Sequence, residues 1–300
     1  MKVKKTSKNE GNSMRSPAPC ERTALITGAS SGFGLLTTVT LARRGWRVLA
    51  TMRDLDRRAK LEEAARAAGV LERIEFLALD VTDGAQIAEL AELVAERPCP
   101  LNAIVNNAGF AMAGFADDVT DAELRRQFDT NFFGAAAVTR AFLPQLRRQG
   151  AGHIVFLSSI SGRMGFPGVG SYVASKFALE GWAETLRLEV KPLGIQVVLI
   201  EPGAFDTDIW GRNATLSVGT EDSQSPNAAR VADWKQSLLK PAARANPQRV
   251  ADGIAAILDN PRPGLRYLFG TDARMGVWLR RLLPWWALER LLIKASGAGK

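Results

Sequence analysis

Tyr172 and Lys176 are the side chains of this sequence whose types and spacing most directly indicate chemistry. They stand four residues apart in the segment 171–176, SYVASK, and side chains at i and i+4 share one face of a helix. An ammonium beside a phenol favours the phenolate, so Lys176 is expected to lower the pKa of Tyr172 towards working pH. The pair therefore predicts a tyrosine that exchanges a proton near neutral pH. The alternative is a chance spacing on a solvated helix face.

A glycine-rich turn lies near the start of the chain. The apolar segment 23–27, TALIT, is a candidate buried strand, and it leads directly into 28–34, GASSGFG. Residues 35–44 then have helical character. A strand, a glycine turn and a helix in this order are the context of a dinucleotide-binding turn, in which pyrophosphate lies at a helix N-terminus. The alternative is an ordinary strand-to-helix turn that happens to be rich in glycine.

The elements that must position these residues alternate along the chain. Apolar runs predict strands at 23–27, 47–53, 74–80, 103–107, 153–159, 196–201 and 266–270. Helical segments separate them, including 84–97 and 247–258. Strands that are apolar throughout are buried on both faces, so we predict the α/β class: a single doubly wound parallel sheet, Rossmann-like, with helices on both faces. Ligands of such sheets gather at the carboxyl ends of the strands. The residues at these ends are Gly28, Arg53, Asp80, Asn107, Ser159 and Pro202.

In their order and spacing, these motifs resemble the short-chain dehydrogenase/reductase family. The motifs are 27–34, TGASSGFG; 106–109, NNAG; Ser159; Tyr172 with Lys176; and Pro202-Gly203. The resemblance spans residues 21–270, and the segment 50–54, ATMRD, is similar to the branch that contains 17β-hydroxysteroid and retinol dehydrogenases. It implies an NAD(P)-dependent alcohol dehydrogenase or carbonyl reductase.

The resemblance also implies catalytic roles for Asn131, Ser159, Tyr172 and Lys176. Tyr172 is the expected proton donor in reduction and base in oxidation, while Lys176 could also bind the nicotinamide ribose. Ser159 resembles the family serine that hydrogen-bonds the substrate oxygen, with Ser158 and Ser161 as nearby alternatives. Asn131 resembles the asparagine that holds a proton-relay water, or it is a polar residue that bends a helix.

The cofactor site implied by the resemblance is larger. The NNAG segment shapes the nicotinamide side, and Asp80 either binds the adenine amino group or is a strand-end turn residue. The predicted cofactor-binding residues are Gly28, Ser30, Ser31, Gly32, Phe33, Gly34, Arg53, Asp80, Val81, Asn107, Ala108, Gly109, Tyr172, Lys176, Pro202, Gly203, Phe205 and Thr207.

The end of the second predicted strand favours NADP, with NAD as the alternative. An acid there would accept from a ribose 2′-hydroxyl and favour NAD, but the sequence has Arg53, whose guanidinium suits a 2′-phosphate. Asp54 follows directly and leaves NAD open.

Composition and charge exclude several classes of function. The net charge is +8, yet residues 1–22 carry net +4 and residues 262–300 net +6, so the body is slightly acidic and no nucleic-acid partner is predicted. Residues 1–20 are interpreted as a disordered basic extension. The single histidine, His153, lies far from Ser159 along its strand, which excludes a Ser-His-Asp triad, and no metal site is predicted. Two cysteines, Cys20 and Cys99, predict no disulfide framework and suit a reducing cytosol.

Two segments stand out from the predicted catalytic domain, residues 21–270. Residues 203–245 are polar and predict a substrate lid. Residues 271–300 form an amphipathic, aromatic and basic helical tail that Pro284 should break. This tail either packs on protein or lies in a membrane interface. We therefore expect a cytoplasmic protein with potential peripheral membrane contact.

The predicted partners are a small apolar carbonyl or alcohol substrate and further copies of the chain. Helices at 121–148 and 171–191 form the contact face of a homodimer or homotetramer in the resembling family. Aromatic and methionine side chains in the loops indicate a steroid-, retinoid- or lipid-like substrate: Phe110, Met112, Phe115, Met164, Phe166, Phe205 and Trp210. Two other functions remain open, a catalytically silent dinucleotide-binding regulator and a membrane-peripheral protein that acts through its tail.

Overall fold

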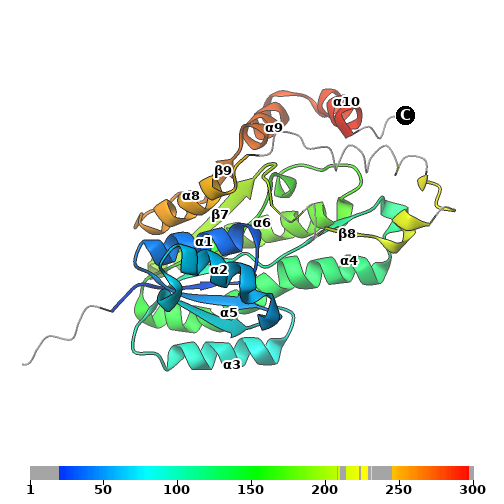
Figure 1. Ribbon diagram of the computed structural model, residues 1–300. Coiled ribbons are helices and arrows are strands. Elements are labelled where there is room, and N and C mark those ends of the chain that lie inside the picture. Colours follow the sequence, from blue (N-terminus) through cyan, green and yellow to red (C-terminus); the bar gives the residue numbers. More distant parts are fainter. Residues whose placement is uncertain are drawn as a thin grey trace, which may run out of the picture.

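A seven-stranded parallel sheet organises the chain, with the strand order β3-β2-β1-β4-β6-β7-β9. Figure 1 shows the computed structural model, with helices on both faces of this sheet. The structure describes residues 20–207, 209, 214–222, 224–228, 231 and 245–296. The predicted disordered extension (apart from residue 20), Trp210 and much of the predicted lid lie outside these residues. The predicted fold class is confirmed.

The seven predicted strands are all present in the sheet, with ends shifted by a few residues. They are β1 (Thr23–Ile26), β2 (Arg47–Met52), β3 (Ile74–Ala78), β4 (Leu101–Asn106), β6 (Gly152–Leu157), β7 (Ile195–Pro202) and β9 (Arg266–Phe269). The helices that cover the sheet are α1 (Gly32–Arg43), α2 (Ala59–Ala67), α3 (Gly84–Ala95), α4 (Asp121–Phe128), α5 (Ala135–Gln149), α6 (Gly170–Val190) and α8 (Gln248–Leu258).

Two apolar cores flank the sheet because neighbouring residues of each strand point to opposite faces. In β1, Ala24 and Ile26 pack with Leu41 of α1 and Ile254 of α8. Leu25 points the other way, into a core built by α3, α5 and α6. Burial on both faces explains why these strands are apolar throughout.

The sheet reverses its winding direction between β1 and β4, which pair in parallel. Open α/β sheets bind ligands at such a switch point, outside the carboxyl ends of the strands. The glycine turn after β1 and the NNAG segment after β4 border this point.

A second, two-stranded sheet joins the predicted lid to the body. β8 (Ala214–Leu216) pairs in parallel with β5 (Ala111–Ala113). Ser217 N also donates to Ala113 O at 2.9 Å. Neither strand was predicted. Each has only three residues, and its backbone hydrogen bonds are made with the other segment, far away in the sequence.

The tail forms two helices, α9 (Thr271–Leu282) and α10 (Trp285–Ser296). They are separated at Leu283 and Pro284, where the sequence predicts a break. In Figure 1 they lie beyond β9, at the opposite end of the molecule from α3. No helix within the described residues has the length and apolar character needed to cross a bilayer.

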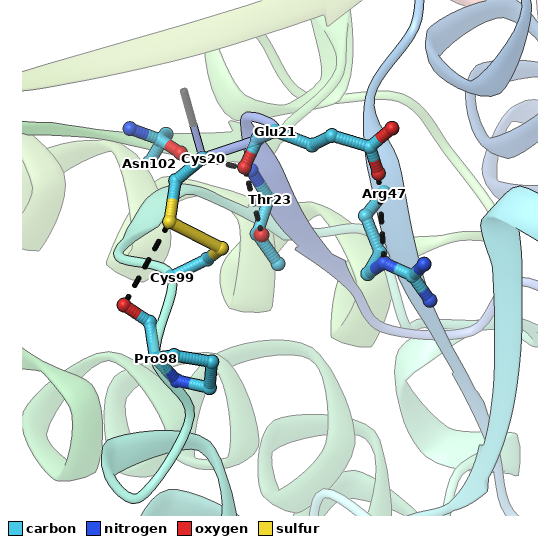
Figure 2. The surroundings of a disulfide bond; sticks show 7 residues. All are labelled: Cys20, Glu21, Thr23, Arg47, Pro98, Cys99 and Asn102. Atoms are coloured by element: carbon cyan, nitrogen blue, oxygen red, sulfur yellow. Dashed lines mark hydrogen bonds and ion pairs between the residues drawn. A yellow bond between two sulfur atoms is a disulfide. The ribbon is translucent and has the colours of Figure 1, made fainter. Parts of the chain in front are cut away.

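Cys20 and Cys99 form a disulfide, with Cα atoms 5.4 Å apart (Figure 2). The interpretation of two cysteines without a framework is therefore wrong. Cys20 precedes β1 and Cys99 precedes β4, and these two strands are neighbours in the sheet. Their separation of 79 residues in sequence concealed this proximity.

Candidate active site

A cavity of about 500 Å³ opens at the carboxyl ends of β1, β2, β4, β6 and β7. It brings together most of the predicted site residues, although they are distributed over almost 180 positions of the chain. The predicted residues that line it are Gly28, Ser30, Ser31, Gly32, Phe33, Arg53, Val81, Asn107, Ala108, Gly109, Ser159, Tyr172, Lys176, Pro202, Gly203, Phe205 and Thr207.

Three predicted site residues do not line this cavity: Gly34, Asp80 and Asn131. Gly34 lies behind the glycine turn, in the first turn of α1. The Asp80 carboxylate accepts from Thr82 N at 2.9 Å and from Thr82 Oγ1 at 2.8 Å. This geometry favours the alternative role of Asp80 as a strand-end turn residue.

The glycine turn has the close packing that only glycine permits. Gly28 has φ +66°, and a Cβ on it would lie 2.8 Å from Ala108 Cα. A Cβ on Gly34 would lie 2.4 Å from both Gly28 O and Asn107 Nδ2. The turn thus presses against the NNAG segment and leaves the N-terminus of α1 facing the cavity, the arrangement that binds pyrophosphate.

Hydrogen bonds fasten the ends of β1 and β4 to one another. Asn107 Nδ2 donates to Thr27 O and to Gly28 O, each at 2.9 Å. Thr27 Oγ1 in turn accepts from Asn107 N and Ala108 N, each at 3.0 Å. This role of Thr27 was not predicted, although a threonine at the end of the first strand indicates a hydrogen-bonding position there.

Tyr172 is buried in the first turns of α6 and borders the cavity beside Ser159. Burial raises the pKa of Tyr172 to about 12, and its hydrogen bond with Ser159 lowers the pKa in part. The phenol is therefore protonated at neutral pH, which suits a proton donor. Tyr172 and Ser159 both line the cavity.

Lys176 is buried one helical turn after Tyr172, and its Nζ lies 5.7 Å from the Tyr172 ring centre. Nζ donates to Leu157 O at 2.6 Å. Burial lowers the pKa of Lys176 to about 8, against the opposing effect of the Glu180 carboxylate. The expectation that Lys176 brings the pKa of Tyr172 down towards working pH is wrong, because burial raises this pKa and outweighs the hydrogen bond with Ser159.

Asn131 lies in a π-helical turn, η4 (Asp129–Gly134), between α4 and α5. Its Nδ2 donates to Phe110 O at 3.0 Å and to Ser175 Oγ at 3.2 Å, and its Oδ1 accepts from Phe110 N at 3.1 Å. Ser175 Oγ donates to Tyr172 O at 2.8 Å. Asn131 thus ties the loop after NNAG to the tyrosine helix, and π-helical turns frequently mark functional sites.

Arg57 is a cavity residue that the sequence analysis missed. It lies on the 3-10 turn η1 (Leu55–Arg58), and its Nε is 3.7 Å from Asp54 Oδ2. Asp54 Oδ1 accepts from Asp56 N at 2.9 Å, so this carboxylate caps the turn. Arg53 and Arg57 therefore place two guanidinium groups at the end of β2. The turn that brings Arg57 back to the cavity has no strong sequence signal.

The other lining residues outside the predicted catalytic and cofactor sets are mostly apolar and adjacent to predicted ones. Some of them have another predicted role: Phe110 is an aromatic residue that indicates an apolar substrate, and Ser158 is an alternative to Ser159. Phe110 follows the NNAG segment, Thr130 precedes Asn131, and Leu157 precedes Ser158 and Ser159. The full additional set is Met52, Asp54, Arg57, Leu79, Phe110, Thr130, Leu157, Ser158 and Ile209. In the described part of the chain, no group of three or more His, Cys, Asp or Glu side chains could hold a metal ion.

Comparison with known sequences identifies relatives over most of the chain. The family described as short chain dehydrogenase matches residues 22–215. The uncharacterized oxidoreductase YusZ of Bacillus subtilis (strain 168) is 40% identical over 278 residues, which cover 91% of this chain and 98% of YusZ. Retinol dehydrogenase 8 of Homo sapiens is 35% identical over 260 residues, which cover 83% of this chain and 81% of that protein.

Solved structures show the same fold. A short-chain dehydrogenase from Streptomyces avermitilis has a TM-score of 0.77 and 34% identity, covering 93% of this chain and 98% of its own. A short chain dehydrogenase/reductase from Burkholderia phymatum, in complex with NAD, has a TM-score of 0.73 and 26% identity, covering 87% of this chain and 93% of its own. The chain therefore belongs to the short-chain dehydrogenase family of oxidoreductases.

Proposed function

We propose that this protein transfers a hydride between a nicotinamide cofactor, preferentially NADP, and an apolar ketone or secondary alcohol. The observation that carries the proposal is that Ser159, Tyr172 and Lys176 line one cavity, with Tyr172 hydrogen-bonded to Ser159. The glycine turn and Arg53 border the same cavity. A buried phenol beside a hydroxyl is suited to proton exchange with a carbonyl oxygen.

The residues present fit a dinucleotide. Gly28 and Gly34 let the glycine turn pack directly against Asn107 and Ala108, and the N-terminus of α1 faces the cavity. When bound, the cofactor supplies or takes up the hydride. In reduction, Tyr172 Oη donates its proton to the substrate oxygen while Ser159 Oγ donates a hydrogen bond to that oxygen. In oxidation, Tyr172 takes the proton back.

Two guanidinium groups support the preference for NADP. Arg53 and Arg57 line the end of the cavity at which an acid would favour NAD. The nearby carboxylate of Asp54 caps η1 instead. The relative from Burkholderia phymatum was solved with NAD, so the preference must be measured for this chain.

Calorimetry with both cofactors tests this preference. Arg53→Ala should weaken NADP binding by about 1.5–3 kcal/mol, the scale of hydrogen bonds to a charged group, and leave NAD binding almost unchanged. Arg57→Ala should act in the same direction. Arg58→Ala is the matched control, because Arg58 lies on the same turn but pairs with Glu62. Equal losses for both cofactors would contradict the assignment.

The cavity lining supports an apolar substrate. Phe110, Phe205 and Ile209 border it, and Phe205 is buried against Phe33 with ring centres 5.7 Å apart. The similarity to retinol dehydrogenase 8 agrees with a steroid-, retinoid- or lipid-like molecule. These apolar side chains would also help to exclude water during hydride transfer.

A screen of ketones and secondary alcohols with NADPH, NADH and their oxidised forms tests the function itself. Tyr172→Phe removes only the phenolic oxygen, so folding and cofactor binding should survive while turnover falls by a factor of about 10² or more. Turnover within a few fold of the wild type would contradict the role of Tyr172. Cofactor binding without turnover of any substrate would instead favour the silent regulator.

A second candidate function, membrane contact, is favoured by the tail. Trp278, Trp285 and Trp286 are each more than 60% exposed. Five cationic side chains share the same two helices: Arg274, Arg280, Arg281, Arg290 and Lys294. Exposed tryptophans and cations together suit an anionic membrane interface.

The tail begins beside the cavity. Asp272 Oδ2 accepts from Ala204 N at 2.6 Å, directly after Pro202-Gly203. A membrane-bound tail would thus bring the cavity close to the place where apolar substrates partition. The expectation of a cytoplasmic protein rested on cysteines without a framework, and the Cys20–Cys99 disulfide removes that support.

Sedimentation with vesicles tests this contact. The wild type should bind vesicles that contain phosphatidylserine, and exchange of Trp285 and Trp286 for serine should weaken binding. Val218→Ser is the control, because Val218 is also exposed but lies outside the tail. If the tryptophan variant and the Val218→Ser control both bind like the wild type, or if no form of the protein binds, the tail packs on protein.

A further inference from the structure

A row of buried charges continues from the active site through the protein. Lys176 and Glu180 follow Tyr172 at four-residue intervals on one face of α6, and all three side chains are buried. Glu180 Oε2 is 3.2 Å from Arg266 Nε, and Arg266 Nε is 3.2 Å from Oε1 of the fully buried Glu201. The charges therefore alternate from the catalytic helix to β9 and on to β7.

Further groups complete this row. Arg163 Nη1 is 3.1 Å from Glu201 Oε1, so the carboxylate is held from two sides. Arg266 Nη2 also lies 2.8 Å from Oε2 of the exposed Glu184 on α6. Arg163 follows the 3-10 turn η5 (Ile160–Gly162), and Glu201 precedes Pro202 at the cavity. Both ends of the row thus reach segments of the active site.

Close packing holds Glu180 against the site. A Cβ on Gly162 would lie 2.8 Å from Glu180 Cγ, 2.8 Å from Ser158 Oγ and 3.2 Å from Lys176 O. Ser158 Oγ and Glu180 Oε1 are buried without a hydrogen bond of ordinary geometry to any described residue, although Ser158 lowers the pKa of the carboxyl. Glu180 is therefore confined between the active-site turn and the catalytic helix.

A buried ion-pair network is a costly way to build a core, because each desolvated ion costs several kcal/mol and apolar residues would pack as well. The buried carboxylate of Glu180 has a role that an apolar residue could not fill, because it stabilises the charge of Lys176. Glu180 is the carboxylate that favours the ammonium form of Lys176, against the effect of burial. Burial and the neighbouring Glu201 carboxylate together raise the pKa of Glu180 to about 7, against the opposing effects of Ser158 and Arg266.

We propose that Glu180, held in place by Arg266, is a positioning residue that keeps Lys176 protonated and so sets the alkaline limit of activity. The groups that face this pair are Tyr172 and Glu184 on α6, Arg163 after η5, Glu201 on β7 and Arg266 on β9. The inference rests on the proposed function, because it assigns Lys176 a role in turnover.

The test compares Glu180→Gln with Glu184→Gln. Both variants remove a carboxylate from Arg266, but only Glu180 acts on Lys176. The alkaline limb of kcat/KM should move down by about one pH unit or more in Glu180→Gln, the scale of a nearby opposite charge. It should remain in place in Glu184→Gln. Glu180→Asp retains the charge and should restore the position of the limb.

A purely structural role predicts a different pattern. If Glu180→Gln lowers the melting temperature but leaves the pH profile unchanged, the proposal is overturned. If that variant does not fold, Arg266→Lys should move the limb in the same direction, because it loosens Glu180 without removing it. An unchanged limb in a folded Arg266→Lys protein also overturns the proposal.

A direct titration separates this inference from the proposed function. Carbon and nitrogen NMR signals of the lysine side chains, with Lys176 assigned through Lys176→Arg, report its protonation without turnover. A lower titration midpoint in Glu180→Gln than in Glu184→Gln supports the inference even if no ketone is reduced. Equal midpoints overturn it whatever the substrate.

Discussion

Replacing Lys176 by methionine should make the protein more stable while it removes activity. Lys176→Met substitutes an apolar side chain of similar length for a buried ammonium. Burial lowers the pKa of Lys176 from 10.5 to about 8. At about 1.4 kcal/mol per pH unit, retaining the proton in the folded state costs about 3 kcal/mol at neutral pH. The variant also loses the hydrogen bond to Leu157 O, worth about 1 kcal/mol, so we expect a net gain of about 2 kcal/mol.

The pH dependence of this gain follows from linkage. The folded-state pKa is depressed, so between pH 8 and pH 10.5 the unfolded chain binds more protons at this site than the folded one. Wild-type stability should therefore rise through this range. The methionine variant has no such group. Its advantage should be complete below pH 8 and disappear as the pH approaches 10.5.

Urea denaturation followed by tryptophan fluorescence measures this difference, at pH 7 and at pH 9.5. Lys191→Met is the matched control, because Lys191 is exposed at the end of α6 and should change stability by no more than about 0.5 kcal/mol. Turnover of Lys176→Met should fall by a factor of about 10² or more. A variant less stable than the wild type at pH 7 would refute the reasoning, because the ammonium would then stabilise the fold.

Two further predictions concern the disulfide and the assembly of the protein. Cys20→Ser should lower the free energy of unfolding by about 2–4 kcal/mol, because the bond links residues 79 apart in sequence; Cys99→Ser and a reductant should each reproduce this loss, and no loss in any of the three would show unpaired thiols in solution. We also expect a homodimer or homotetramer that uses the exposed apolar residues Leu124, Phe133 and Leu188 of the α4–α6 region. Leu188→Glu should shift the wild-type mass towards that of a monomer in light scattering, and a wild type that is already a monomer at micromolar concentration would contradict the expectation.

The sheet, the glycine turn and the shared helix face of Tyr172 and Lys176 could be predicted from the sequence alone. These features depend on residue types and on spacings between residues that are close in the sequence. Continuously apolar segments are strands buried on both faces, and four-residue spacing puts Tyr172 and Lys176 on one helix face. Parallel strands also bring their carboxyl ends to one edge, which is why Ser159 and the glycine turn could be predicted to meet.

Tertiary structure decided the electrostatics of the site. The spacing of Tyr172 and Lys176 predicts a lowered pKa for the tyrosine. The direction of the pKa shift depends on how deeply the phenol is buried, and the spacing carries no information on burial. Arg57 reaches the cavity only because η1 turns it back. Asp80 faces Thr82 rather than the cavity because the strand ends before it.

Contacts between distant segments were likewise decided by the fold. Glu180 and Arg266 are 86 residues apart, and Cys20 and Cys99 are 79 apart. The two cysteines meet because the strand order places β1 beside β4. Glu180 and Arg266 meet because α6 packs on β7 and β9 lies beside β7. The sequence supplies the charges and thiols, but their neighbours follow from a topology that forms only when the whole sheet is assembled.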